Sequence, residues 1–272
     1  MSTRALPKFE SPPVIETVIG LQFAPIAGFT NAHAGWFWKS YLDNSWDRVV
    51  EVPRLQDVFE RFGDERVYGL PATFALRTGP EAERTQIICS DTGRMIQVQD
   101  TRLILNWRKS PNSAEYPSFD VLNKQYEELL RGFSKFAKDV GTDQLDFNQW
   151  EVVYVNHIPK GEIWNSLNDW NRILSFFSIP PAPAGEIICD TFAGQWVLEL
   201  PSRLGRLHIA VQHGRTEGSS GGEVMVLQLT ARGPIREGRQ IAEDLAAGHD
   251  EIVSSFANMT TAVAHEHWKR TQ

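Results

Sequence analysis

The sequence has only two cysteines in 272 residues, Cys89 and Cys189, and neither belongs to a Cys-x-x-Cys pair. A disulfide framework and a cysteine-ligated zinc site are therefore not expected. We expect two separate, buried thiols on equivalent strands, which fits a reducing cytoplasm.

Long apolar runs are also missing. No stretch of about 18 apolar residues occurs, so no membrane-spanning helix is expected. The polar, proline-bearing N-terminus lacks the apolar core of a signal peptide. Together with the cysteines, these absences predict a cytoplasmic protein that makes no use of a membrane.

Positive charge is in short supply, because the formal net charge is −7. A phosphate-binding surface needs an excess of Lys and Arg, so nucleic acid is not expected as a partner. The second half nevertheless concentrates arginines, which could form a basic patch on one sheet or be scattered over the surface. The candidates are Arg203, Arg206, Arg215 and Arg232.

No catalytic or cofactor motif rises above background. The one Gly-x-Ser-x-Gly match, at Gly218, Ser220 and Gly222, precedes an expected strand and not a helix, so flexible-loop composition explains it better than a hydrolase site does. Neither a phosphate loop nor a dinucleotide fingerprint occurs, and no cofactor is expected. His265-Glu266-His267 places two histidines two positions apart, which on a helix points them about 200° apart. We therefore expect no metal site there.

The sequence does contain one short internal repeat. Ile187-Ile188-Cys189-Asp190 repeats Ile87-Ile88-Cys89-Ser90 one hundred positions later. This repeat suggests two related halves; a chance match between unrelated halves is the alternative.

Periodicity and turn residues give both halves a similar order of elements. In the first half we expect a strand at 14–23, helices at 32–42 and 55–62, strands at 85–90, 95–99 and 102–107 with a further one at 66–76, and a long helix at 119–140. In the second half we expect a strand at 150–158, a helix at 163–177, strands at 186–200, 206–213 and 223–231 with a flexible loop tip at 218–222, and helices at 238–258 and 260–270.

The order predicts an α+β fold built as a tandem pseudo-repeat, in which each half runs strand, helix, antiparallel meander, long helix. Each long helix covers one face of an antiparallel sheet. We place the halves at 1–145 and 146–272, as two units or as one continuous domain. The element order is analogous to that of TATA-binding-like folds.

Short motifs along the chain carry a resemblance to a known family. They are Pro12-Pro13-Val14-Ile15-Glu16, Tyr154-Val155-Asn156, and His249 followed by Phe256, Thr260-Thr261 and Trp268. In these the chain resembles a sporadically distributed bacterial family of uncharacterised proteins of about this length. The resemblance implies a bacterial or archaeal source and a patchy distribution, and it implies no activity. Patchy distribution is common among defence and toxin–antitoxin genes, so the resemblance points to an accessory or immunity role.

Three polar residues are candidates for a pocket between the halves: Glu16, Asn156 and His249. His249 lies close to the apolar stripe of the last long helix, where it could fasten the helix to the sheet or act chemically. Glu16 is its expected partner if the first strand lies under that helix. Asn156 ends the central strand, where ligands are often met, although asparagine there also bonds local backbone.

Trp36, Trp38 and Trp46 are candidates for an interface. Trp36 and Trp38 are two positions apart, so one helix face cannot easily bury both. One of them is therefore expected at a surface, in contact with a partner chain or a second copy. Burial of both between elements of one chain is the alternative.

These observations favour a non-enzymatic binding or interaction protein that acts through a partner surface, in an accessory or immunity role. The alternative is a small-molecule sensor or an enzyme whose pocket lies between the halves.

Overall fold

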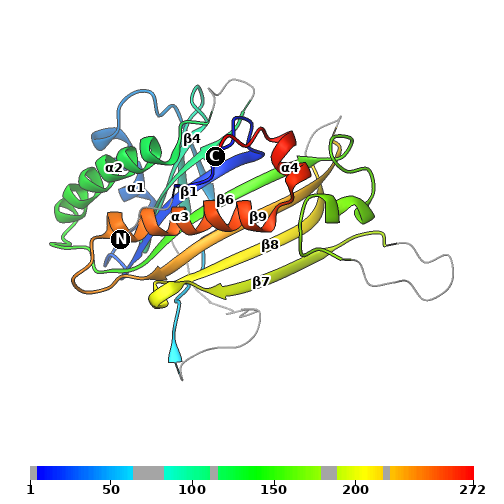
Figure 1. The fold of residues 1–272 in the computed structure, drawn as a ribbon. Coiled ribbons are helices and arrows are strands. Elements are labelled where there is room, and N and C mark those ends of the chain that lie inside the picture. The colour runs from blue at the N-terminus through cyan, green and yellow to red at the C-terminus, as the bar shows by residue number, and fades with distance from the viewer. Residues whose placement is uncertain (1–4, 64–82, 111–115, 179–188, 217–220) are drawn as a thin grey trace.

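The structure is a computed structural model, and it describes residues 5–63, 83–110, 116–178, 189–216 and 221–272. These residues form one nine-stranded sheet in the order β2-β3-β4-β5-β1-β6-β9-β8-β7 (Figure 1). Every neighbouring pair is antiparallel. The strands are β1 (Val14–Phe23), β2 (Arg48–Val52), β3 (Arg84–Cys89), β4 (Arg94–Gln99), β5 (Arg102–Arg108), β6 (Phe147–Pro159), β7 (Ala193–Glu199), β8 (Arg206–Arg215) and β9 (Glu223–Pro234).

The helices are α1 (Asn31–Tyr41), α2 (Phe119–Asp139), α3 (Ile241–Met259) and α4 (Ala262–His267), with short 3-10 helices η2 (Leu167–Arg172) and η3 (Pro201–Arg203). Figure 1 shows α2 and α3 lying across the same face of the sheet. None of the helices in the described residues is long and apolar enough to cross a membrane.

Strand alternation separates an apolar face from a polar one. On β1, Ile19, Leu21 and Phe23 are buried on the helix-covered face, where Phe23 meets Phe133 of α2 at 5.8 Å between ring centroids. Gln22 points to the opposite face. That face carries most of the sheet's buried polar side chains, among them Gln97, Gln99, Arg102, Asn106 and Gln149.

The long helices form because their apolar residues recur at helical spacing. In α2, Leu122, Tyr126, Leu129, Phe133 and Phe136 are all buried, which matches one helix face. The Tyr126 hydroxyl also donates to the Leu103 carbonyl at 2.9 Å and so fastens α2 to β5.

Two predicted helices are wrong. The segment 163–177 contains only η2. After it, contacts with the end of α3 take the place of helical hydrogen bonds: Leu174 bridges Thr260, and the Ser175 N–H donates to the Met259 carbonyl at 2.9 Å. Residues 55–62 are not helical because their backbone N–H groups donate to glutamine side chains of the sheet. The short strand β2 was not predicted.

The two cysteines occupy unlike places, contrary to expectation. Cys89 is buried at the end of β3, whereas Cys189 is only partly buried in the loop before β7, where its Sγ donates to the Thr191 carbonyl. Of the strand predicted at 186–200, residues 189–192 are not in a strand, and β7 begins at Ala193. Ile187 and Ile188, the strand predicted at 66–76 and positions 218–220 of the loop tip lie outside the described residues.

The α+β class with antiparallel strands is confirmed. The sheet also continues across the predicted boundary between residues 145 and 146, since β1 pairs with β6 over almost its whole length.

Candidate functional site

A cavity of about 470 Å³ opens on the helix-covered face, between α2, α3 and the N-terminal segment. Its volume is in the range of small-molecule sites, which is about 300–1,000 Å³. Most of its walls are apolar or aromatic, and they include Pro7, Phe9, Val14, Phe119, Leu229, Ile252, Val253 and Phe256.

The N-terminal segment forms one wall of this cavity, and the C-terminal residues hold that segment in place from outside the cavity. The Thr271 N–H donates to the Lys8 carbonyl at 2.9 Å, and the Glu10 N–H donates to the Lys269 carbonyl at 3.1 Å. Phe9 packs edge-on against Phe256 of α3. The N-terminal segment is therefore held in place by the C-terminal residues.

A short chain of hydrogen bonds runs along the polar side of the cavity. The Tyr116 and Tyr154 hydroxyls lie 2.8 Å apart, and the Tyr154 hydroxyl lies 2.9 Å from Nδ1 of His249. The His249 ring stacks on Phe119 with centroids 4.1 Å apart. Stacking and hydrogen bonding together fix the imidazole on α3.

Burial lowers the pKa of His249 to about 4, and the charge of Asp120 opposes this shift only weakly. Burial likewise raises the pKa of Tyr154 well above its ordinary value. At neutral pH both groups are therefore uncharged, so they offer hydrogen bonds to a ligand without a charge of their own. The other ionisable side chains that line the cavity are Lys8, Asp120 and Asp250.

The cavity unites two of the three predicted pocket residues. Asn156 and His249 both line it. Asn156 is buried, and its Nδ2 donates to the Leu227 carbonyl at 3.0 Å, which fixes the side-chain amide.

The third residue, Glu16, lies on the opposite face of the sheet. Its carboxylate accepts from Asn106 Nδ2 at 2.6 Å and lies 3.7 Å from Arg108 Nε. The predicted contact between Glu16 and His249 is therefore wrong. The reason is strand alternation, because Thr17 faces the helices and Glu16 points away from them.

Several cavity residues were not predicted. Tyr154 is the clearest, since it lies two positions before Asn156 on the same face of β6 and could have been found from that spacing. Tyr116 and Phe9 could not, because their positions depend on contacts between segments far apart in the sequence.

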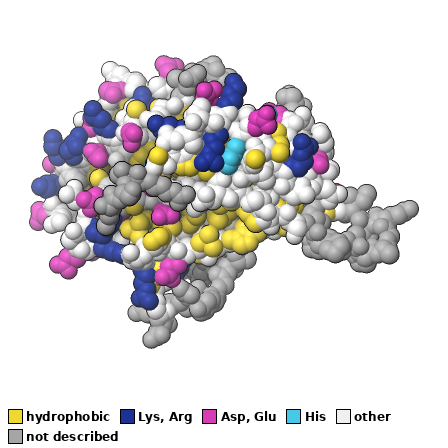
Figure 2. Space-filling model, in the orientation of Figure 1, with side chains coloured by type: hydrophobic (Ala, Val, Ile, Leu, Met, Phe, Trp, Pro, Cys, Tyr) yellow, Lys and Arg dark blue, Asp and Glu magenta, His cyan; other side chains and the backbone are white. Residues whose placement is uncertain are grey.

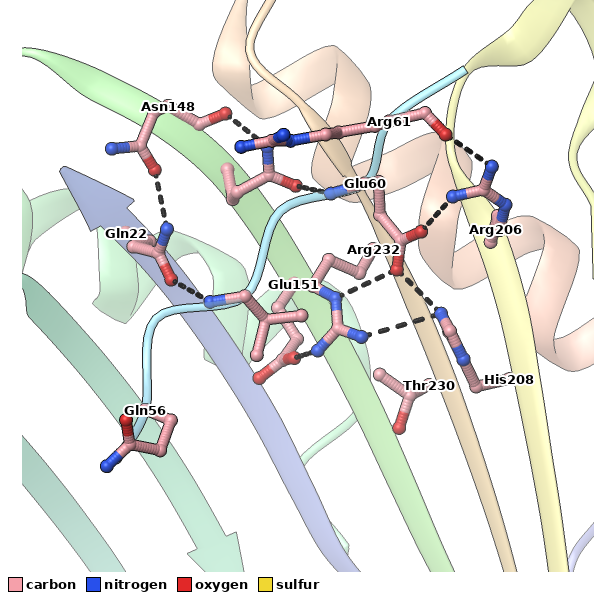
Figure 3. A network of polar contacts seen from close by, with 12 residues as sticks. Gln22, Gln56, Glu60, Arg61, Asn148, Glu151, Arg206, His208, Thr230 and Arg232 are labelled. Carbon is pink, nitrogen blue, oxygen red and sulfur yellow. Dashed lines mark hydrogen bonds and ion pairs between the residues drawn. The ribbon is translucent and has the colours of Figure 1, made fainter. Parts of the chain in front are cut away.

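A polar network lies on the opposite face, centred on the buried carboxylate of Glu60 (Figure 3). Glu60 accepts from Arg206 Nη1 at 2.5 Å, from His208 Nε2 at 2.7 Å and from Arg232 Nε at 3.1 Å. Arg232 also donates from Nη1 to Glu151 at 2.9 Å. Because His208 Nε2 must carry the hydrogen that it donates to Glu60, the 3.4 Å approach of Arg232 Nη2 to that nitrogen is not a hydrogen bond.

Burial alone would raise the pKa of Glu60. Hydrogen bonds from His208 and Arg206 and the charge of Arg232 outweigh it, and they lower the pKa to about 2. The carboxylate is therefore ionised at any ordinary pH.

Glu60 belongs to residues 53–63, an extended segment that we call the strap. Figure 3 shows the strap crossing over the strands on this face. Its backbone N–H groups at Leu55, Val58 and Glu60 donate to the side chains of Gln99, Gln22 and Gln149, at distances of 3.0 to 3.1 Å.

The predicted basic patch is therefore only partly assembled. Arg206 and Arg232 meet at Glu60. Arg215 lies at the far end of β8, about 30 Å from Arg206 at the usual rise per strand residue. Arg203 instead approaches Glu199 at 3.8 Å. The four arginines do not form one surface.

The three predicted interface tryptophans differ in exposure. Trp36 is 42% exposed, with its ring against Phe136 of α2. Trp38 and Trp46 are half-buried and joined, because Trp38 Nε1 donates to the Trp46 carbonyl at 2.7 Å. Their role in an interface stays a prediction.

The described residues hold no group of three or more His, Cys, Asp or Glu side chains that could bind a metal ion. His265 lies 2.8 Å from the Thr260 hydroxyl, whereas His267 contacts Glu162 at 3.1 Å. The two rings therefore bind different partners.

No protein-family model matches the chain, and no curated protein matches it. Among solved structures, the chain is similar to DynU16, a protein of the dynemicin biosynthetic locus, at 10% sequence identity and a TM-score of 0.25. The match covers 94% of this chain and 98% of that one. A TM-score this low carries no argument about fold or function.

Proposed function

We propose that the protein is a non-enzymatic binding protein whose ligand is a small, largely apolar molecule held in the cavity between α2 and α3. The observation that carries the proposal is the cavity itself, with apolar walls and one fixed, uncharged chain of hydrogen-bonding groups. Such a combination is typical of ligand sites, where apolar contact gives affinity and a few polar groups give orientation.

The walls define the ligand's chemistry. Phe119, Ile252 and Phe256 favour a hydrophobic body of aromatic or branched aliphatic character. His249 and Asn156 favour one uncharged polar group, such as a hydroxyl, a carbonyl or an amine on an aromatic ring. The N-terminal segment, from Leu6 to Phe9, flanks this body on one side.

The electrostatics support binding over catalysis. A general base at neutral pH works best with a pKa near 7. With a pKa of about 4, His249 accepts a proton poorly under those conditions. An enzyme with a pocket between the halves would need another group to take the proton, and the carboxyl groups of Asp120 and Asp250 also line the cavity.

The test is a fluorescence titration with 1-aminoanthracene, a neutral probe of apolar cavities. We expect saturable binding at one site per chain. Ala246→Trp should fill the cavity from α3 and weaken binding at least tenfold. Asn258→Trp, on the same helix but outside the cavity, is the matched control and should bind as the unchanged protein does. Equal binding by all three proteins would contradict the proposal.

Binding of a partner chain is a second candidate, favoured by one observation. Strand β7 lies at the sheet edge, and among the described strands only β8 pairs with it. On it, Val197 and Leu198 are 55% and 50% exposed. Figure 2 shows further hydrophobic side chains gathered in a band below α3. Exposed apolar edges of this kind pair readily with another strand.

We propose a second copy of the chain as the partner, because its own β7 edge presents the same exposed Val197 and Leu198. Light scattering should find a dimer that Val197→Lys converts to a monomer, because a lysine on an edge strand opposes pairing. A monomeric unchanged protein would count against self-association. An accessory or immunity role in a defence or toxin–antitoxin locus, and a cytoplasmic location, stay predictions; the genomic neighbourhood tests the first.

We also propose that residues 1–145 and 146–272 are a tandem pseudo-repeat with TATA-binding-like element order. In support, β1 and β6 pair at the centre, and each pairs on its other side with the last strand of its own half, β5 or β9. A long helix follows each of those last strands. Superposition of residues 14–139 on 147–259 should match these strands. The two cysteines already differ, because Cys89 lies in a strand and Cys189 lies in a loop.

A further inference from the structure

The strap is bound to the sheet through polar contacts. Glu60 is its one buried residue, whereas Phe59 remains 48% exposed. Its remaining contacts include a hydrogen bond from Arg102 Nη2 to the Gln56 carbonyl at 2.6 Å and one from Arg206 Nη2 to the Arg61 carbonyl at 2.5 Å. Because water or a ligand can replace hydrogen bonds of this kind, the strap is an element that can detach while the sheet stays folded.

The groups beneath the strap belong to two neighbouring, hydrogen-bonded strands. Arg206 and His208 project from β8, and Arg232 projects from β9 beside them. The side chains of the two arginines are 12% and 15% exposed. The sheet fixes their backbone positions next to one another, so all three donors belong to one patch of this face and can converge on an anion that takes the place of Glu60.

This arrangement of donors requires an anion. Two guanidinium groups and an imidazole meet there. Of the carboxylates that belong to the sheet strands, Glu151 forms an ion pair with Arg232. Glu60 supplies the rest of the negative charge, and it comes from the strap. Cations that are this far from water destabilise the protein unless an anion pairs with them. Removing Glu60 without replacing it by another anion would therefore cost free energy.

A further cation extends the same face. Arg102 is only 6% exposed, and its Nε has no hydrogen-bond partner. Its Nη2 donates to Gln22 Oε1 as well as to the strap, and among the described residues no carboxylate lies within 4 Å of the guanidinium. A ligand that displaced the strap would thus uncover a third guanidinium on this face, which is buried and has an N–H without a partner among the described residues.

We propose that Arg206, His208 and Arg232 form a binding site for an oxyanion, a phosphate or carboxylate group, and that Glu60 occupies this site when the ligand is absent. Arginine forks and an imidazole N–H match the oxygens of such groups. The ligand displaces the Glu60 carboxylate and with it the strap. This site is separate from the cavity and does not rest on the function proposed for it.

The strap competes as a tethered ligand. A group linked to its site acts at an effective concentration of about millimolar. The unchanged protein should therefore bind single anions weakly, and a ligand with two anionic groups should compete better because it can accept from more of the converged donors.

Calorimetric titration with inorganic pyrophosphate and with succinate, at constant ionic strength, tests the proposal and distinguishes phosphate from carboxylate. We expect Glu60→Ala to bind one of the two at least tenfold more tightly than the unchanged protein does. Adding Arg206→Ala to that variant should abolish the gain. Glu266→Ala removes one exposed negative charge elsewhere and should leave affinity unchanged.

Strap release gives a second readout that needs no variant. In the unchanged protein, saturating pyrophosphate or succinate should speed trypsin cleavage after Arg61 several-fold. Glu60→Gln, which keeps the side-chain shape, should shift affinity in the same direction as Glu60→Ala. Unaltered anion affinity in the Glu60 variants, or an unaltered cleavage rate at saturating anion, would overturn the proposal and leave Glu60 as a permanent structural lock.

Discussion

Burial and ion pairing act on Glu60 in opposite directions. Removing a carboxylate from water disfavours its charged form, yet two guanidinium groups and an imidazole more than compensate. Glu60 therefore links the strap to β8 and β9 in the second half of the sheet.

Neutralising Glu60 should destabilise the protein. Breaking a buried ion pair by removing one partner costs about 3–5 kcal/mol, because the other charges remain buried. We expect Glu60→Gln to lower the free energy of unfolding at pH 7 by about 3 kcal/mol in urea titrations. Glu266→Gln, at an exposed site, should change it by less than about 0.5 kcal/mol.

The same variant should change the acid limb of the stability curve. The pKa of Glu60 is lowered from 4.5 to about 2 in the folded state, so its contribution is complete above pH 4.5 and is lost as pH falls toward 2. The unchanged protein should therefore lose stability more steeply over that window than Glu60→Gln does. Parallel curves would contradict the assignment.

His249 should show a second, separate pH dependence. Its pKa is lowered from 6.5 to about 4, so the folded protein resists protonation that the unfolded chain accepts. The resulting stability is present above pH 6.5 and is lost as pH falls toward 4. NMR titration of the imidazole should give a midpoint near 4; a midpoint near 6.5 would show that the ring is solvated.

At the level of single residues, the sequence predicted part of the cavity. Asn156 and His249 were found because each is a polar residue next to an apolar stretch, and they do share a cavity. Glu16 was assigned to the wrong face, although alternation from Ile19 and Leu21 would have excluded it. Glu60 gave no signal, because its partners Arg206 and Arg232 lie 146 and 172 positions away in the sequence.

Among the elements, α3 lies unusually close to the sheet at Gly248. A Cβ atom there would lie 2.5 Å from Cζ3 of Trp150 on β6, and that indole is fully buried. Gly132 on α2 offers a matched comparison, since nothing lies within 4 Å of its Cβ position.

We expect opposite effects from the same substitution at these two glycines. Alanine favours a helix over glycine by about 0.5–1 kcal/mol, so Gly132→Ala should stabilise the protein by roughly that amount. Gly248→Ala should destabilise it by about 1–3 kcal/mol, because Trp150 must move within a packed core. Thermal unfolding measures both, and stabilisation by Gly248→Ala would contradict the close packing of α3 on β6.

Elements governed by their own periodicity were predicted well. The strand at 14–23 has exactly the bounds of β1, and α2 and α3 follow their apolar stripes. The failures have a common physical cause. At 55–62 and 163–177, hydrogen bonds to distant residues such as Gln99 and Met259 replace the local helical ones, and no short-range pattern reveals them.

The whole molecule has two distinct candidate sites because one continuous sheet has two unlike faces. The helix-covered face encloses the apolar cavity, and the opposite face carries the polar network beneath the strap. The continuity of the sheet across residues 145 and 146 follows from the pairing of β1 with β6. Sequence alone suggested two halves but could not show how they join, since strand pairing between distant segments leaves no local trace.

The central claim is that the space between α2 and α3 is a ligand site, and a crystal structure of the protein with bound 1-aminoanthracene tests it most directly. The account predicts the aromatic body between Phe119 and Ile252, with its amine within hydrogen-bond reach of His249 or Asn156. An empty cavity, or the probe bound elsewhere, would contradict it.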